Sequence, residues 1–291
     1  MLFRPLLLLG LLALMLSTVA QAQDLYLGSV SIEGQTLRVG PFTNVTQRPG
    51  YDNQPAFTPD GAAVLFTSIR DDGQADIYRY DIAAGATRRV TATAESEYSP
   101  TPMPRGGTFS VVRVERDSSQ RLWRFDAAGS TPEIVLEGIQ PVGYHAWADA
   151  SHLALFVLGA PPTLQVADAR TGKAEVIDRN IGRSLHRIGD RRAVSYVSKA
   201  DSSQWWITEY DLRTGATSRL APTVGGGEDH AWLANGWIVM GDDTSLRYWI
   251  PGDGTWRLAA DLAAQGVTDI SRIAVSPTGG RIVLVAADAP H

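Results

Sequence analysis

The sequence predicts an all-β fold, namely a single six-bladed β-propeller built from four-stranded blades. Three observations carry this prediction: a turn motif that recurs about every 44 residues, four short strand-like segments in the clearest repeat, and half a repeat at each end of the chain. A repeat of this length with four strands is typical of propellers. A β-sandwich also strings hairpins together, but it does not repeat one turn motif at a constant period.

The clearest repeat lies between residues 51 and 95. It opens with Pro55-Ala56-Phe57-Thr58-Pro59-Asp60-Gly61, whose last residues favour a tight turn. Three more strand-like segments follow at residues 64–68, 76–81 and 87–91, separated by turn residues such as Gly and Asp. These segments are short and lack helical spacing, so we expect each repeat to fold as four antiparallel strands.

The opening turn recurs at nearly constant spacing along the chain. Its anchors lie 45, 45, 41, 44 and 43 residues apart, at Gly61, Gly106, Ser151, Arg192, Gly236 and Gly279. The spacing predicts five intact blades at residues 51–95, 96–139, 140–182, 183–225 and 226–265, and a composite blade made of residues 23–50 and 266–291.

The composite blade follows from the two ends of the chain. Two strand-like segments, residues 25–32 and 36–42, precede the first intact repeat, and two more, near 270–275 and 281–286, come last. We expect these halves to pair as one blade. The pairing closes the ring and removes a sheet edge that would otherwise stay exposed.

The first 22 residues have the features of a secretory signal peptide. Arg4 supplies the positive charge, residues 6–19 form the apolar stretch, and Ala20-Gln21-Ala22 fits the cleavage pattern. The apolar stretch is shorter than the roughly 20 residues that cross a bilayer, although a retained anchor is the alternative. We therefore expect a periplasmic or secreted protein, with no transmembrane segment after cleavage behind Ala22.

Composition and missing motifs narrow the function classes. The 291 residues include 26 Lys and Arg against 31 Asp and Glu, a formal charge of −5, which disfavours nucleic acid as a partner. Cysteine is absent, so disulfides, thiolate metal sites and cysteine nucleophiles are excluded. The sequence also lacks a phosphate-binding loop, a His-Glu-x-x-His motif, an EF-hand loop and a Gly-x-Ser-x-Gly nucleophile motif.

The repeat resembles a known family. Pro-x-Phe-x-Pro-Asp-Gly at residues 55–61, an apolar strand, and Asp-Ile-Tyr-x-x-Asp at residues 76–81 are similar to the repeat of TolB-type propellers. Related repeats occur in prolyl-oligopeptidase-like enzymes and in oligogalacturonate lyases. The resemblance covers the propeller only, without the α/β domain that precedes it in TolB or the hydrolase domain of the peptidases. It therefore implies a propeller-only exported protein rather than a role in the Tol–Pal system.

Three of the five histidines occupy one position of the repeat: His145, His186 and His230. The first strand of each blade lines the central channel of a propeller, so these side chains are expected to form an arc at one depth. Three imidazoles on consecutive blades could hold a divalent metal or an anionic ligand. Further candidates for this channel mouth are Glu97, Tyr98, Tyr144, Asp229 and Arg272.

A structural role for the same histidines is the alternative. Period-two alternation places each histidine on the strand face of the following Trp or Ile, where it can hydrogen-bond a neighbouring blade. The predicted function is therefore a non-enzymatic module that binds an envelope protein, or a small anionic or saccharide ligand, at one end of the channel. The competing function is a metal-assisted polysaccharide lyase or hydrolase that uses the histidines and a divalent metal cofactor.

The signal peptide gives a first testable prediction. Intact-mass analysis of the exported protein should show a chain that begins at Gln23, because the small-x-small pattern ends at Ala22. Recovery of the full 291-residue chain in the membrane fraction would instead support a retained anchor.

Overall fold

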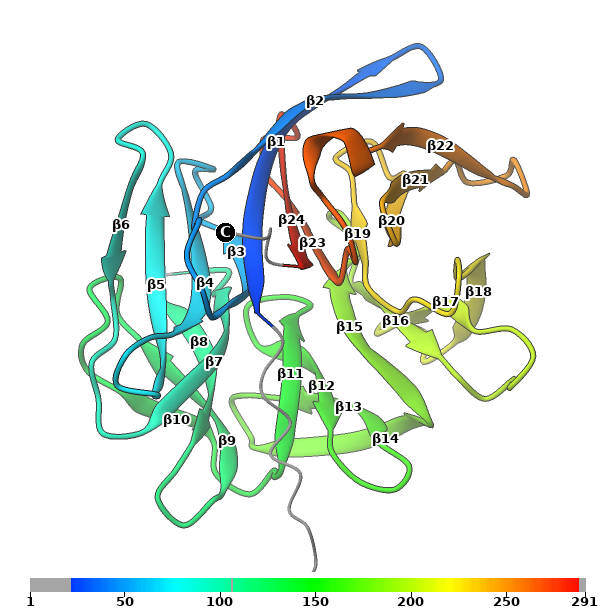
Figure 1. The fold of residues 1–291 in the computed structure, drawn as a ribbon. Helices are drawn as coiled ribbons and strands as arrows, with labels where there is room; N and C mark the ends of the chain where they lie inside the picture. Colours follow the sequence, from blue (N-terminus) through cyan, green and yellow to red (C-terminus); the bar gives the residue numbers. More distant parts are fainter. Residues whose placement is uncertain (1–21, 106, 288–291) are drawn as a thin grey trace, which may run out of the picture.

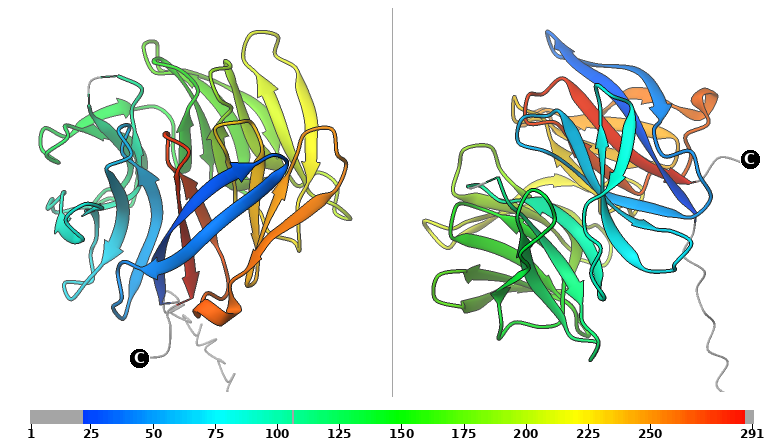
Figure 2. Two further views of the ribbon diagram at one scale, coloured as in Figure 1. Left: turned by 90° about the horizontal axis from the view of Figure 1, so that it is seen from above. Right: turned by 90° about the vertical axis from the view of Figure 1, so that its left-hand side faces the viewer.

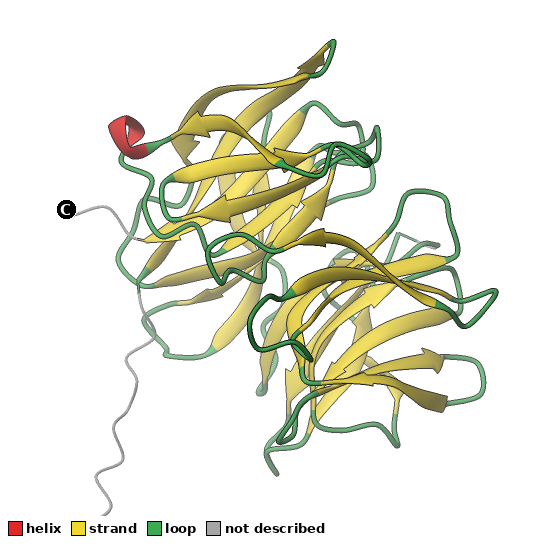
Figure 3. Ribbon diagram, turned by 90° about the vertical axis from the view of Figure 1, so that its right-hand side faces the viewer, coloured by secondary structure: helices red, strands yellow, loops and turns green. Residues whose placement is uncertain are grey.

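The computed structural model describes residues 22–105 and 107–287, and the predicted signal peptide lies almost entirely outside this range. The described part consists of 24 strands and one short 3₁₀ turn, η1 (Ala263–Gln265). Figure 3 shows how completely strands dominate the molecule. Within residues 22–105 and 107–287, no helix has the length and apolar character needed to cross a membrane.

Four antiparallel sheets contain four consecutive strands each. The first comprises β7 (Ser96–Pro102), β8 (Phe109–Val114), β9 (Gln120–Phe125) and β10 (Glu133–Leu136). The second comprises β11 (Val142–Trp147), β12 (His152–Val157), β13 (Thr163–Asp168) and β14 (Lys173–Arg179). The third comprises β15 (Ile181–Arg187), β16 (Ala193–Ser198), β17 (Trp206–Asp211) and β18 (Thr217–Pro222). The fourth comprises β19 (His230–Trp232), β20 (Ile238–Asp242), β21 (Ser245–Trp249) and β22 (Trp256–Asp261).

The remaining eight strands form one sheet that divides into two units. One unit comprises β3 (Tyr51–Phe57), β4 (Ala63–Ile69), β5 (Ala75–Asp81) and β6 (Ala86–Arg89). The other runs in the order β23 (Arg272–Val275), β24 (Arg281–Ala287), β1 (Gln23–Glu33) and β2 (Thr36–Asn44). A single parallel pair, Gln23 with Tyr51, joins the two units.

The first strands of the units surround a common centre (Figure 1). Contacts run from β3 to β7, then to β11, β15, β19 and β23, and from β23 back to β3. The outer strands lie at the periphery, as the two views of Figure 2 show. This radial arrangement of four-stranded units is that of a β-propeller.

Strands from the two ends of the chain lie side by side. β1 pairs antiparallel with β24 along seven residues, from Gln23 opposite Ala287 to Ser29 opposite Arg281. The segments predicted at residues 25–32 and 36–42 are strands slightly longer than expected. The strand expected near residue 270 begins only at Arg272, because the backbone N–H of Ile270 donates to Asp243 of the neighbouring unit.

β24 is apolar at successive positions because both of its faces are buried. Val283 and Val285 pack with residues of the β3–β6 unit, whereas Ile282 and Leu284 pack with residues of the β19–β22 sheet. Successive side chains of a strand point to opposite faces, and here both faces are covered by another sheet. The core therefore lies between the units, on both sides of each sheet.

The pairing of β1 with β24 can be tested by a disulfide, because the chain has no cysteine of its own. Ser29→Cys with Arg281→Cys places thiols on two paired, exposed residues, and we expect a bridge under mild oxidation. By closing a long loop, the bridge should raise the free energy of unfolding by roughly 2–4 kcal/mol in urea denaturation.

The matched control is Ser31→Cys with Arg281→Cys, which lies two residues out of register on the same strand. This pair should bridge slowly and stabilise less. Equal bridging by both pairs, or no bridge in the first, would contradict the observed register.

Candidate functional site

A cavity of about 1,060 Å³ lies at the centre around which the inner strands are arranged. Residues from all six inner strands, β3, β7, β11, β15, β19 and β23, line it. Its wall comes from the C-terminal ends of these strands and the loops behind them, and it includes Pro55, Pro59, Pro100, Pro102, Pro104, Pro251 and Pro277. Its floor comes from the N-terminal halves of the strands and is polar. The cavity therefore combines an apolar entrance with a charged base.

The prolines of the wall follow from the position of the inner strands. The inner strands other than β3 are edges of their sheets, and β3 pairs with β1 only at Tyr51. Free N–H and C=O groups therefore face the channel, and proline removes donors that could recruit another strand. The residues before Pro55 and Pro100, Gln54 and Ser99, have positive φ angles of 57° and 55°. The strand register shifts at both places, which marks β-bulges.

The first bulge aims Gln54 at the neighbouring unit. Its side-chain oxygen accepts hydrogen bonds from the backbone N–H of Ser99 and from the hydroxyl of Thr67, both at 2.8 Å. A glutamine of β3 thus fixes the start of the bulge in β7. The bulges therefore hold adjacent inner strands at a defined separation around the cavity.

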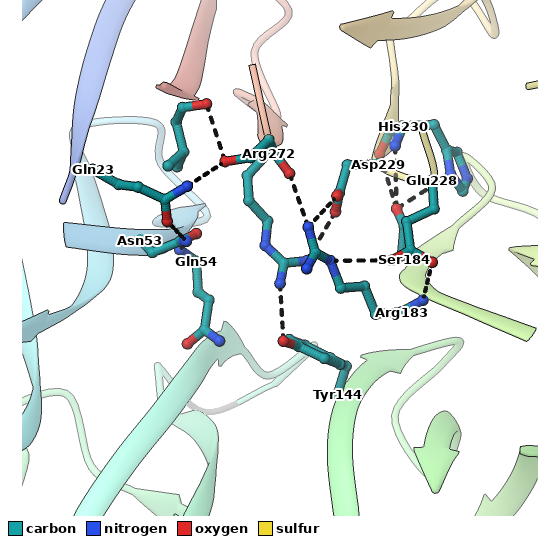
Figure 4. A network of polar contacts seen from close by, with 12 residues as sticks. Gln23, Asn53, Gln54, Tyr144, Arg183, Ser184, Glu228, Asp229, His230 and Arg272 are labelled. Carbon is teal, nitrogen blue, oxygen red and sulfur yellow. Dashed lines mark hydrogen bonds and ion pairs between the residues drawn. The ribbon is translucent and has the colours of Figure 1, made fainter. Parts of the chain in front are cut away.

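The floor is organised around Asp229, which lies just before β19. Its two oxygens accept hydrogen bonds from Arg272 of β23 at 2.8 Å and from Arg183 of β15 at 2.9 Å (Figure 4). Arg272 also donates to the hydroxyl of Tyr144 at 3.0 Å, and its guanidinium lies 4.7 Å from the centre of that ring. Four units thus meet in one polar cluster.

The neighbouring Glu228 is shared between Lys199 and Arg183, which lies 3.5 Å away. Its carboxylate lies 2.8 Å from the ammonium group of Lys199 and also accepts the backbone N–H of Arg183 at 3.2 Å. Close to the cluster, burial and Tyr144 raise the pKa of Tyr51 to about 12, so its phenol stays protonated near neutral pH. Asp229 is the carboxylate that contacts both arginines.

His145 is held between two sheets. The side chain is buried, and its Nε2 lies 2.7 Å from the hydroxyl of Ser110 on β8 of the preceding sheet. The indole N–H of Trp147 donates to the same hydroxyl oxygen at 2.9 Å. Two side chains of a His-x-Trp segment thus hydrogen-bond one serine of the adjacent unit. We call this arrangement the serine clamp.

The serine clamp recurs two units later. His230 Nε2 lies 2.8 Å from the hydroxyl of Ser195, and Trp232 donates its indole N–H to that oxygen at 2.8 Å. His186 lies beside this second clamp, with its ring centre 4.7 Å from that of His230. The hydroxyl of Ser184 lies within 3.2 Å of a nitrogen of each ring. These contacts match the alternative in which the histidines join neighbouring units.

The predicted three-histidine metal site stays a prediction, and the geometry of the described residues does not favour it. In the described part of the chain, no three His, Cys, Asp or Glu side chains are placed to hold a metal ion. The physical reason is that nitrogens of His145, His186 and His230 are turned towards serine hydroxyls rather than towards a common point.

The other predicted site residues divide into two groups. Tyr144, Asp229 and Arg272 reach the floor of the cavity, and the three histidines lie along its wall. Glu97 does not reach the cavity: it is fully buried, accepts a hydrogen bond from Arg113 at 3.1 Å, and burial raises its pKa. Tyr98 packs instead against the core between β7–β10 and β11–β14.

Arg183 is a floor residue that the sequence reasoning missed. When the repeats are aligned at the turn after the inner strand, Arg183 lies three residues before His186, whereas Tyr144 lies one residue before His145. The two residues therefore do not align. Counted forward from the strand start, Ile181-Gly182-Arg183 matches Val142-Gly143-Tyr144. The register shift within β15 separates the two counts. A search for apolar-Gly-polar strand starts would have found it.

Comparisons with known proteins agree on the fold. No family model matches the sequence. An uncharacterized protein of Agrobacterium fabrum strain C58 is 31% identical over 78 residues, 27% of this chain, so the match spans about a quarter (26%) of that relative. A protein assigned as TolB from Agrobacterium tumefaciens superimposes with a TM-score of 0.71 at 16% identity, covering 91% of this chain and 98% of its own.

The chain has the TolB-like β-propeller fold. TolB of Acinetobacter baumannii also superimposes, with a TM-score of 0.58 at 14% identity over 91% of this chain and 64% of its own. An oligogalacturonate lyase in complex with manganese gives a TM-score of 0.52 at 14% identity, over 92% and 98%. At such identities the likeness to TolB and to the lyase concerns the fold alone. The chemistry of this TolB-like propeller must therefore be argued from its own residues.

The buried histidines give a prediction about pH. Burial lowers the pKa of His145 to about 3 and that of His186 to about 4, against about 6.5 in an unfolded chain. Both are therefore neutral when folded, and acid favours unfolding. As the pH is lowered from 6.5 to about 4, we expect the free energy of unfolding to decrease. Each of the two histidines should contribute roughly 1.4 kcal/mol per pH unit to this decrease.

The control is the double variant His145→Gln with His186→Gln. Loss of the Ser110 contact should cost about 1 kcal/mol at pH 7.5, and stability should depend less on pH between 6.5 and 4.5. Other buried groups, such as Glu97, titrate alike in both proteins and cancel in the comparison. Parallel pH profiles for the two proteins in urea denaturation would overturn this account.

Proposed function

We propose that this protein is an exported, non-enzymatic binding module that receives a protein partner at the mouth of its central cavity. In this proposal the units form six blades, and the blade β23-β24-β1-β2 closes the ring. Support for closure comes from the pairing of β1 with β24 and from the contacts of β23 with β3. A closed ring makes the mouth rigid, which lowers the entropic cost of binding.

The observation that carries the proposal is the apolar wall above a charged floor. Prolines at the rim, such as Pro59, Pro104 and Pro277, are exposed and have almost no side-chain entropy to lose on contact. The cavity volume of about 1,060 Å³ lies at the upper end of the range for small-molecule sites. It suits a protruding segment of a partner.

Export is supported by where the fold begins. β1 starts at Gln23, the residue after the predicted cleavage site. Gln23 is already held there: its backbone N–H donates to Gly50 at 2.9 Å and its side-chain amide donates to Ser271 at 2.9 Å. Removal of the preceding residues would therefore leave every strand of the composite blade intact. A periplasmic or secreted location follows from this proposal.

The enzymatic alternative has less support among the described residues. A general base in the cavity would need a free imidazole or carboxylate. Both nitrogens of His230 lie near serine hydroxyls, and the fully buried His145 holds one nitrogen on Ser110. Both oxygens of Asp229 are engaged with guanidinium groups. The fold likeness to a manganese-bound oligogalacturonate lyase is not accompanied, within residues 22–105 and 107–287, by a group of three His, Cys, Asp or Glu side chains placed to hold a metal ion.

Site-specific crosslinking tests the proposal, because a cysteine-free chain accepts a single engineered thiol. Ala234→Cys places a photo-crosslinker on an exposed residue of the cavity rim, and we expect one discrete adduct in envelope extract. An excess of unlabelled protein should suppress that adduct. The matched control is Leu258→Cys on the outer strand β22, where the side chain is 56% exposed.

Equal labelling from both positions, or none from the rim, would contradict binding at the mouth. Release of unsaturated uronate from polygalacturonate in the presence of manganese would instead favour the lyase alternative.

A further inference from the structure

The floor of the cavity carries more positive than negative charge. Among the residues that line this floor, Arg183 and Arg272 contribute two cations and Asp229 contributes one anion. Beside the floor, Glu228 lies 2.8 Å from Lys199 and 3.5 Å from Arg183, so this second carboxylate is shared with a third cation. One positive charge therefore has no counter-charge in a half-buried place, where screening by water is weak.

The surrounding groups do not supply the missing negative charge. Tyr51 stays a neutral phenol, and burial together with Arg272 keeps His186 neutral at pH 7. The hydroxyl oxygen of Tyr144 accepts a hydrogen bond from Arg272, which leaves its own O–H free to donate. The floor is thus a set of donors with too few acceptors.

The two arginines have donor capacity left. A guanidinium carries five N–H groups, and Arg272 bonds through Nη1 to Asp229 and through Nη2 to Tyr144. Its Nε is buried and has no hydrogen-bond partner among the described residues. A buried polar group left unpaired in a native structure indicates a ligand, ion or water that completes its bonding. An acceptor with two oxygens would suit a guanidinium fork best.

We propose that Arg183, Arg272 and Tyr144 bind the C-terminal carboxylate of a peptide segment that enters the cavity. This inference rests on the proposed function and names the part of the partner that reaches the floor. A chain end can enter a funnel enclosed by six inner strands as a single strand, whereas an internal acidic residue must bring two flanking segments with it. The apolar, proline-rich wall then contacts the preceding residues of the peptide, which favours a peptide over a saccharide.

The test uses two pools of fluorescein-labelled randomised hexapeptides, one with a free C-terminal carboxylate and one with a C-terminal amide. We expect enrichment from the carboxylate pool only. The best peptide should bind at least tenfold more weakly as its amide, and its affinity should fall as salt is raised. A peptide with the carboxylate moved to an internal Glu should bind as weakly as the amide.

The variants separate the floor from the rest of the surface. Arg272→Gln and Arg183→Gln should each weaken binding at least tenfold in fluorescence polarisation, and Arg272→Lys should recover only part of it because the fork is lost. The matched control is Arg257→Gln, an arginine of β22 paired with Asp253, which should bind normally. If Arg272→Gln fails to fold, the double variant Arg272→Gln with Asp229→Asn is used in its place. It removes both partners of that ion pair and leaves no unpaired carboxylate there.

Several results would overturn the inference. These are equal binding of carboxylate and amide, no enrichment from either pool, unchanged affinity in the arginine variants, or a thermal shift with phosphate but not with peptide. If enriched peptides bind equally well with and without a free C-terminal carboxylate, and crosslinking occurs at the rim, this inference is wrong but the proposed function is still supported. Absence of rim crosslinking would remove the proposed function itself.

Discussion

Seven residue pairs between β1 and β24 join the two ends of the chain in one sheet, and the position of every inner strand depends on this pairing. Because each unit packs against both neighbours, the unit that contains β1 must complete two interfaces at once. Leu25 and Val283 face the β3–β6 unit, and Tyr26 and Leu284 face the β19–β22 sheet. Without the pairing, Arg272 on β23 would not be held opposite Arg183, and the cavity floor would not form.

The two serine clamps also fix the positions of neighbouring sheets around the centre. Each clamp places two donors or acceptors of one inner strand on a hydroxyl of the preceding sheet, so the contact is lost if the sheets separate by even an ångström or two. A buried hydroxyl with two partners is satisfied, whereas the same hydroxyl alone would disfavour folding. The two clamps thus fix the separation of neighbouring sheets at two interfaces around the cavity.

The fold was largely predictable because its signals are local: turn residues at Gly61 and Gly236, short apolar strands, and half a repeat at each end. For the histidines the sequence left a ligand-binding and a structural role open, and the serine partner was not predictable, because Ser110 and His145 lie 35 residues apart and meet only when two sheets pack. The recurring His-x-Trp segment marked the position correctly but not the partner. Arg183 was missed for a different reason, since a register shift in β15 breaks the count from the turn.

The cavity floor shows how stability and binding compete in such a ring. Burying two guanidinium groups with one carboxylate gains less than it costs in lost hydration, unless every remaining donor finds an acceptor. Asp229 keeps Arg183 and Arg272 close together at the floor. The free protein therefore holds a preorganised pair of cations that it cannot neutralise by itself. A second carboxylate at the floor would balance the charges two against two, so binding would stabilise the centre of the ring as well as the complex.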